Sequence, residues 1–206
     1  MILYHADRSG QLSEGMPLRL KTDFTLNNEK QAIFHECFPD GLSMHGIHYA
    51  ADQRLVFQVL SVQITPSSSC PCVPLGYIGD AHSLLGNTIC EYQFELVRKA
   101  FFPHNPSRFQ SIFAVEKMDD FVQWEDTGIG KDCAVYEIET DDLFRFDSSW
   151  LRGGLSLGPV GRPSHLGFSP SINLDLAFNY WKGISSPSPR WEYVIPLPAV
   201  VGRRVR

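Results

Sequence analysis

The sequence predicts an α+β fold with strands at both ends of the chain and the main helices between them. Two observations predict it. Residues 1–8, 191–197 and 200–205 have the β-branched and aromatic character of strands. The strand and helix patterns also do not alternate regularly, as they would in a wound βαβ fold. Since no internal repeat is present, we expect the whole chain, residues 1–206, to form one domain.

The elements of the first half follow from local composition and from the spacing of apolar residues. In order, they are a strand over 1–8, a polar connection over 9–30, a short helix over 28–34 that ends before Pro39-Asp40-Gly41, a strand or buried helix over 54–64, and a Pro- and Ser-rich loop over 65–82. The clearest helix follows, because apolar residues recur at helical spacing until Pro103 stops the run. It is predicted over residues 88–103 from Ile89, Tyr92, Leu96, Val97, Ala100 and Phe101.

The second half contains short strands, two helices and two loops. In order, they are a strand over 106–116, a short amphipathic helix over 118–124, a half-buried strand over 133–140, a Gly- and Pro-rich loop over 151–170, a helix over 174–181, a loop over 182–189, and the two final strands. Long loops in a compact domain often carry function, so both loops are candidates for contact with a substrate.

Composition and charge favour a globular protein that does not bind nucleic acid non-specifically. Hydrophobic residues make up 43% of the chain, and the net charge is −5, whereas non-specific nucleic-acid binders usually carry a basic excess. We find neither a signal-peptide pattern nor an apolar stretch of about 18 residues, so we expect no membrane insertion. The five cysteines lack the spacing of a disulfide framework, which fits a reducing compartment.

Several common catalytic motifs are absent from the sequence. It has no GxGxxG after a strand, no complete phosphate-binding loop, no GxSxG and no HExxH. A zinc site could draw on the Cys70-Pro71-Cys72 pair and on His35, His45 and His48. Because a second cysteine pair is missing, we favour surface cysteines and hydrogen-bonded histidines, and we predict no metal.

The most unusual local feature is the polar end of the first strand. Ile2-Leu3-Tyr4 runs directly into His5, Asp7 and Arg8, and a turn at Ser9-Gly10 follows. Taken alone, this pattern fits either a hydrogen-bonded structural histidine or a ligand-binding one. Glu192, between Trp191 and Tyr193 on a late strand, also allows two interpretations. It could lie on the exposed face of an edge strand, or it could belong to a functional site.

Three segments give the chain a resemblance to a known family. They are LYHADR at the start, PSRFQSIFA in the middle, and YWKG followed by RWEYVIPL near the end. In this order they resemble a poorly characterised bacterial domain-of-unknown-function family that we place in the ADP-ribosyltransferase superfamily. The resemblance covers nearly the whole chain. It implies a split, strongly bent β-core with flanking helices that clasps NAD, which is the substrate of the reaction.

The resemblance also implies which residues bind NAD and which act on it. His5 corresponds to the first-strand position that binds the adenosine ribose, and Ser107, Arg108 and Phe109 correspond to the second core strand. Glu192 corresponds to the late glutamate, whose carboxylate would stabilise an oxocarbenium-like transition state as nicotinamide leaves. The predicted catalytic residues are Glu192, His5 and Ser107. The predicted NAD-binding residues are His5, Arg8, Ser107, Arg108, Phe109 and Tyr180, with the two arginines facing the pyrophosphate and Tyr180 at the adenine.

The implied activity is mono-ADP-ribosylation of a protein side chain by a monomeric enzyme. Superfamily toxins that modify arginine carry Glu two residues before the late glutamate, whereas Arg190 stands there in this chain, so a Ser or Thr acceptor is favoured. The protein could be an effector that acts on a host protein such as ubiquitin, and we expect it in the bacterial cytoplasm or injected into a host cytosol. The alternatives are an NAD glycohydrolase, a nucleic-acid-modifying relative and a non-catalytic NAD-binding module.

Overall fold

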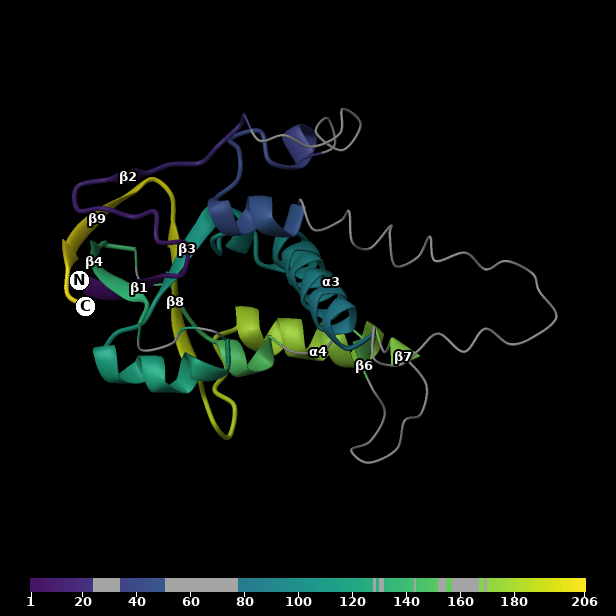
Figure 1. The fold of residues 1–206 in the computed structure, drawn as a ribbon. Coiled ribbons are helices and arrows are strands. Elements are labelled where there is room, and N and C mark those ends of the chain that lie inside the picture. The colour runs from purple at the N-terminus through teal and green to yellow at the C-terminus, as the bar shows by residue number, and fades with distance from the viewer. Residues whose placement is uncertain are drawn as a thin grey trace.

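The computed structural model has the predicted α+β architecture, with two antiparallel sheets and two long helices (Figure 1). It describes residues 1–23, 34–50, 78–127, 129, 132–142, 144–151, 155–156, 167–168 and 170–206. In this part of the chain no helix is both long and apolar enough to cross a lipid bilayer.

The larger sheet contains the first and last strands of the chain. Its order is β1-β4-β9-β2, from β1 (Ile2–Asp7), β4 (Ala134–Glu139), β9 (Ala199–Arg204) and β2 (Pro17–Leu18). β1 pairs with β4 along its whole length, and His5 lies opposite Tyr136. Both termini consequently lie on the sheet side of the molecule, away from the long helices (Figure 1).

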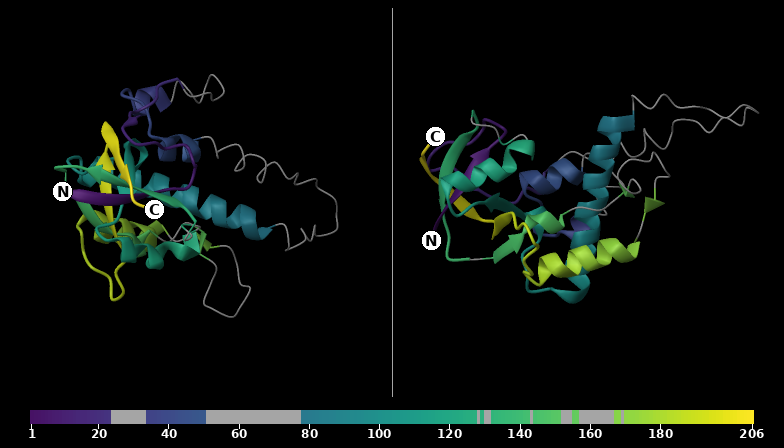
Figure 2. Two further views of the ribbon diagram at one scale, coloured as in Figure 1. Left: turned by 60° about the vertical axis from the view of Figure 1, so that its left-hand side comes forward. Right: turned by 90° about the horizontal axis from the view of Figure 1, so that it is seen from below.

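The smaller sheet supplies the second half of the β-core. Its order is β3-β8-β5, from β3 (Ser111–Ala114), β8 (Trp191–Pro196) and β5 (Phe144–Asp147). The two sheets meet where Tyr4 of β1 and Val115, just after β3, exchange both backbone hydrogen bonds at 2.9 Å. The β-core is therefore divided into two short sheets that are joined at this bridge (Figure 2).

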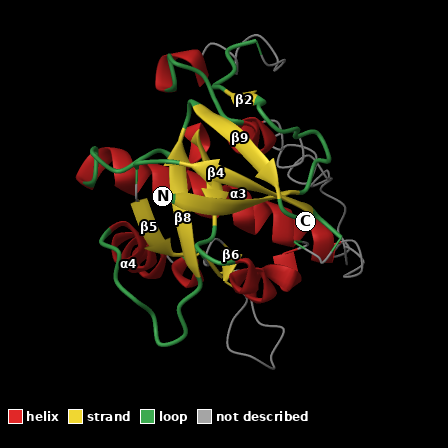
Figure 3. Cartoon of the chain, turned by 90° about the vertical axis from the view of Figure 1, so that its left-hand side faces the viewer, coloured by secondary structure: helices red, strands yellow, loops and turns green. Residues whose placement is uncertain are grey.

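The helices cover one face of the smaller sheet. Helices α3 (Ile78–Phe101) and α4 (Pro170–Trp181) pack on β5 and β8, as Figure 3 shows with α3 behind the strands. Since successive strand residues point to opposite faces, β8 contributes to two cores. Val194 packs among the helices, whereas Tyr193 and Ile195 pack against the larger sheet. Glu192 has the same parity as Val194 and therefore faces the helices.

Shorter elements complete the described chain. They are the 3-10 helices η2 (Arg108–Gln110), η3 (Met118–Thr127) and η4 (Ser148–Trp150), the paired strands β6 (Leu155–Ser156) and β7 (Gly167–Phe168), and helical residues at 34–37 and 44–50. Gly46 allows the 44–50 segment to approach Phe109 closely, because a Cβ there would lie 2.2 Å from the Phe109 carbonyl oxygen.

Several sequence predictions are confirmed. The strands expected over 1–8, 133–140, 191–197 and 200–205 are β1, β4, β8 and β9, the helix over 174–181 lies within α4, and the segment over 182–189 is a loop. The short helix over 118–124 is present as the 3-10 helix η3.

Other predictions need correction. Helix α3 begins at Ile78, inside the predicted loop 65–82. The strand expected over 106–116 is wrong in its first half, because Arg108–Gln110 turn toward α3, where a buried carboxylate accepts from Arg108. Strand β5 was not predicted, since four residues are too short a pattern to identify. The element expected over 54–64 and most of the helix over 28–34 lie outside the described residues.

Candidate functional site

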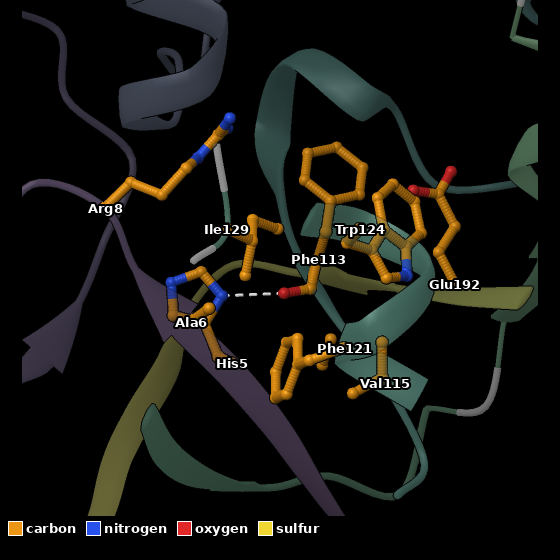
Figure 4. Close-up of a pocket in the computed structure, with 10 residues that line it drawn as sticks. His5, Ala6, Arg8, Phe113, Val115, Phe121, Trp124, Ile129 and Glu192 are labelled. Atoms are coloured by element: carbon orange, nitrogen blue, oxygen red, sulfur yellow. Dashed lines mark hydrogen bonds between the residues drawn. The ribbon is translucent and has the colours of Figure 1, made fainter. Parts of the chain in front are cut away.

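A pocket between the end of β1 and η3 brings together residues from both ends of the chain (Figure 4). Its cavity volume is about 80 Å³, which is below the roughly 300–1,000 Å³ of usual small-molecule sites. Its polar lining consists of His5, Arg8 and Glu192. Its apolar lining consists of Ala6, Phe113, Ala114, Val115, Phe121, Trp124 and Ile129. Three of the predicted site residues therefore share one pocket.

His5 is held in one orientation by the backbone of the neighbouring strand. Its Nδ1 lies 2.6 Å from the carbonyl oxygen of Phe113 (Figure 4), and since a carbonyl only accepts, Nδ1 carries the hydrogen. Burial lowers the pKa of His5, so the ring is neutral at pH 7. A neutral ring with its hydrogen on Nδ1 has an acceptor lone pair on Nε2. His5 can thus accept a hydrogen bond from a hydroxyl in the pocket.

Asp7 organises the turn that follows β1. Its carboxylate accepts hydrogen bonds from the backbone N–H groups of Ser9, Gly10 and Leu12, at 2.8 to 2.9 Å, and from the Ser9 hydroxyl. All of its described bonds are to this turn, which immediately follows Arg8 at the edge of the pocket. The polar cluster at the end of β1 therefore divides into a turn anchor, Asp7, and two pocket residues.

Glu192 is buried and fixed through one of its two oxygens. It lies on the central strand of the smaller sheet with 2% of its surface exposed. Its Oε1 accepts hydrogen bonds from Nη1 of Arg108 at 2.5 Å and from Oη of Tyr180 at 2.7 Å. Among the described residues no donor reaches Oε2, although Glu192 forms part of the pocket lining. One oxygen is thus held while the other remains available to a ligand.

Arg108 connects Glu192 to a second carboxylate, Glu91 of α3. Its Nε and Nη2 donate to the two oxygens of Glu91 at 2.8 and 2.9 Å, and its Nη1 also donates to Tyr180 at 2.6 Å. We call Glu91, Arg108, Tyr180 and Glu192 the buried ion cluster, since all four side chains are buried.

The protonation states within the buried ion cluster follow from burial and from its charges. Burial alone would raise the pKa of Glu91, but Arg108 and His45 hold it below its usual range, so Glu91 is ionised. Burial and the carboxylates raise the pKa of Tyr180 well above its usual value, so its hydroxyl remains a donor to Glu192.

Four predicted site residues do not reach the pocket. Arg108 and Tyr180 belong to the buried ion cluster, so the donors of Arg108 are used on protein groups and not on a pyrophosphate. Phe109 is completely buried and stacks on Phe38, so it cannot stack on a nicotinamide ring. Ser107 precedes the η2 turn, and its buried hydroxyl has no hydrogen-bond partner among the described residues.

The structure adds residues that the sequence did not single out. Phe113, Phe121 and Trp124 supply aromatic walls to the pocket, and Glu91 anchors Arg108. The ring of His45 contacts Phe113 edge-on at 4.6 Å between centroids. A weak signal existed only for Phe113, which alternates with Ile112 and Ala114 on a predicted strand.

Within the described part of the chain, no three His, Cys, Asp or Glu side chains come together that could hold a metal ion. His45 Nε2 lies 3.5 Å from Glu91, and the ring of His48 packs against Tyr49. Cys70 and Cys72 lie outside the described residues, so the zinc hypothesis that involves them stays untested.

The loop that precedes Glu192 is anchored by Asp147 of β5. Its carboxylate accepts hydrogen bonds from the backbone N–H groups of Ser149, Ser186 and Arg190 at 2.6 to 2.9 Å. Trp150 adds a hydrogen bond from its indole N–H to the carbonyl oxygen of Ile184. The 182–190 loop therefore has a defined conformation beside the start of β8.

Asp147→Asn is expected to lower the free energy of unfolding by about 1–3 kcal/mol at pH 7, because an amide N–H₂ then faces a backbone donor. Although burial alone would raise the pKa of Asp147, the three N–H donors lower it below the ordinary value. Its contribution is therefore present above the unfolded pKa of about 3.9 and is lost as pH falls through the lower folded pKa. Urea unfolding of both proteins from pH 7 to pH 2 should show the difference shrinking with acid. Exposed Asp142→Asn is the control, and a pH-independent difference would contradict the assignment.

Comparison with known protein families identifies a match that covers most of the chain. The model of a family described as "Protein of unknown function (DUF2441)" matches residues 3–205. A search of curated proteins found no match. The match includes both strands that contribute polar residues to the pocket.

Proposed function

The chain belongs to the DUF2441 family, and we propose that it is an NAD-dependent mono-ADP-ribosyltransferase that modifies a protein side chain. The observation that carries the proposal is the pocket whose lining includes both His5 of β1 and Glu192 of β8. These are the first-strand and late-strand positions that the resemblance implies. The division of the β-core into two short joined sheets also fits the proposal.

The chemistry of the pocket suits cleavage of the bond between ribose and nicotinamide. As nicotinamide leaves, positive charge develops on the ribose, and a carboxylate that is already held in place stabilises it. Glu192 would supply this carboxylate, with Oε2 turned to the ribose because Oε1 is bound by Arg108 and Tyr180. The acceptor hydroxyl then attacks the anomeric carbon, nicotinamide departs as a neutral molecule, and the hydroxyl proton is released to water as the new C–O bond forms.

The remaining lining would bind and orient NAD. The Nε2 of His5 can accept a hydrogen bond from a ribose hydroxyl, and the Arg8 guanidinium can bind the pyrophosphate. Phe113 and Trp124 offer aromatic surfaces on which a planar base can stack.

The acceptor that we favour is a serine or threonine. Arg190, two residues before Glu192, has its guanidinium 5.2 Å from the centre of the Trp124 ring at the edge of the pocket. A cation at this place repels an arginine acceptor, whereas a neutral hydroxyl is tolerated. The ordered 182–190 loop is the surface beside the pocket that an acceptor protein would contact. Host ubiquitin is one acceptor to test.

The test is nicotinamide release from labelled NAD by the full chain, with and without cell lysate or added ubiquitin. Release that depends on added protein, together with label on that protein, is expected. Release without an acceptor would instead indicate a glycohydrolase, and release that requires added nucleic acid would indicate a nucleic-acid-modifying enzyme. Intact NAD that binds without release would indicate a non-catalytic module.

A further inference from the structure

We propose that Glu91 of α3 is a positioning residue for Glu192 and acts through Arg108. This inference rests on the proposed function, because it assigns Glu91 a role in the same reaction. Glu91 does not line the pocket, so it does not touch the substrate. Its side chain is bound to the guanidinium that binds Glu192.

The contacts show how Glu91 determines the way Arg108 meets Glu192. A guanidinium can bind a carboxylate through two parallel N–H groups, and this bidentate arrangement is its strongest mode. Glu91 takes that arrangement, since it accepts from both Nε and Nη2. Of the three N–H groups that remain, the two on Nη1 donate to Glu192 and Tyr180. In this arrangement Arg108 binds Glu192 through Oε1 alone, and Oε2 stays available for the substrate.

The surroundings of Arg108 fix the plane of the guanidinium. Its Cζ lies 4.4 Å from the centre of the Phe113 ring and 5.4 Å from that of Tyr180. These contacts leave rotation within the plane as the main freedom of the group. If the carboxylate of Glu91 is removed, Arg108 can turn so that two of its N–H groups face Glu192. Both oxygens of Glu192 would then be occupied by protein donors, and the substrate would have to displace one.

Charge balance leads to the same conclusion. Two buried carboxyl groups share the single positive charge of Arg108. Without the Glu91 carboxylate, the whole charge of Arg108 would be directed at Glu192 and would weaken its interaction with a positive ribose. Glu91 therefore keeps one oxygen of Glu192 available to the substrate. It also limits how far Arg108 neutralises the carboxylate that would stabilise the ribose.

The same helix provides a matched control. Glu95 and Arg98 also form a buried bidentate pair, with bonds of 2.8 and 3.0 Å, but this pair has no described contact with Glu192. Glu95→Gln therefore removes the same kind of interaction from α3 but leaves the contacts of Arg108 with Glu91 and Glu192 unchanged.

The experiment measures kcat and KM for nicotinamide release by the wild type, Glu91→Gln, Glu95→Gln, Arg108→Lys and the double variant Glu91→Gln/Arg108→Lys. Glu91→Gln should lower kcat by about 10- to 100-fold, with KM for NAD nearly unchanged. This range is the one found in metalloenzymes when a residue that orients a metal ligand is mutated. Glu95→Gln should keep the kcat of the wild type. In the Arg108→Lys background, Glu91→Gln should lower kcat little further, because the guanidinium that connects Glu91 to Glu192 is already absent.

Thermal unfolding of each variant shows whether it is folded in the assay. If Glu91→Gln is unfolded, Glu91→Asp replaces it. The shorter side chain keeps the negative charge but weakens the bidentate hydrogen bonds to Arg108, so a several-fold loss of kcat is expected. A wild-type kcat in folded Glu91→Gln or Glu91→Asp, an equal loss in Glu95→Gln, or fully additive effects with Arg108→Lys would overturn the positioning role alone. An inactive wild type would overturn the proposed function and this role together.

Discussion

Arg108→Met is expected to lower the free energy of unfolding by about 3–5 kcal/mol, the range found when one partner of a buried ion pair is removed. Arg108 has 4% of its surface exposed and neutralises both Glu91 and Glu192. Methionine fills a similar volume but offers no donor, so two buried carboxylates would remain without a counter-charge. Urea unfolding at pH 7 measures the effect.

A matched control separates this effect from a general cost of losing an arginine. Arg145 of β5 is exposed, and its guanidinium lies 4.1 Å from the centre of the Trp191 ring. Arg145→Met should therefore cost only about 1 kcal/mol or less. The triple variant Arg108→Met/Glu91→Gln/Glu192→Gln should recover part of the lost free energy of unfolding. Its two glutamines are uncharged and therefore do not need a buried counter-charge. A cost below about 1 kcal/mol for Arg108→Met would show that the cluster does not need its cation.

The fold class could be predicted because the patterns that define it are local. Strands such as β1, β4 and β8 have β-branched and aromatic residues in short continuous runs, and α4 and the end of α3 have helical spacing. The interpretation of Glu192 as the exposed face of an edge strand is wrong, because β8 is the central strand of its sheet and Glu192 is buried. The alternation in β8 could not tell whether Glu192 faces solvent, since that depends on α3 and α4 covering the helix side of the sheet.

Two of the implied residues that line the pocket lie on regular strands, whereas three of those that do not line it lie at an irregular turn. His5 and Glu192 belong to β1 and β8, so their side chains point where the strand period predicts. Ser107, Arg108 and Phe109 were assigned to a strand that starts only at Ser111. The η2 turn changes the direction of these side chains, and Arg108 enters the ion cluster while Phe109 enters the core.

The partner of Arg108 could not be predicted from the sequence. Glu91 lies on a helix whose apolar face includes Cys90 and Phe94, and a glutamate beside such a face is usually solvated. Its burial arises only when η2 brings a cation against it in the folded protein. A site of this kind is a tertiary property, which explains why Glu192, Arg108 and Tyr180 were indicated but neither Glu91 nor the contacts that join these residues.

Glu192→Gln is expected to reduce the rate of nicotinamide release by about 10²- to 10³-fold, the usual effect of removing one electrostatic contact to a transition state. The glutamine keeps an oxygen that can accept from Arg108 and Tyr180, so the side chain should stay in place. It loses the negative charge that would stabilise the ribose, and its N–H₂ group would face the pocket as a donor. Since His5 and Arg8 are unchanged, KM for NAD should change little.

The control for this variant is Glu139→Gln, which alters an exposed glutamate at the end of β4, far along the sheet from the pocket lining. It should release nicotinamide at the wild-type rate. Circular dichroism and thermal unfolding of Glu192→Gln distinguish a loss of chemistry from a loss of fold, because a folded variant with a low kcat has lost only the carboxylate charge. If folded Glu192→Gln instead keeps an activity within about threefold of the wild type, Glu192 is a structural member of the ion cluster. The reaction would then have to take place at another site.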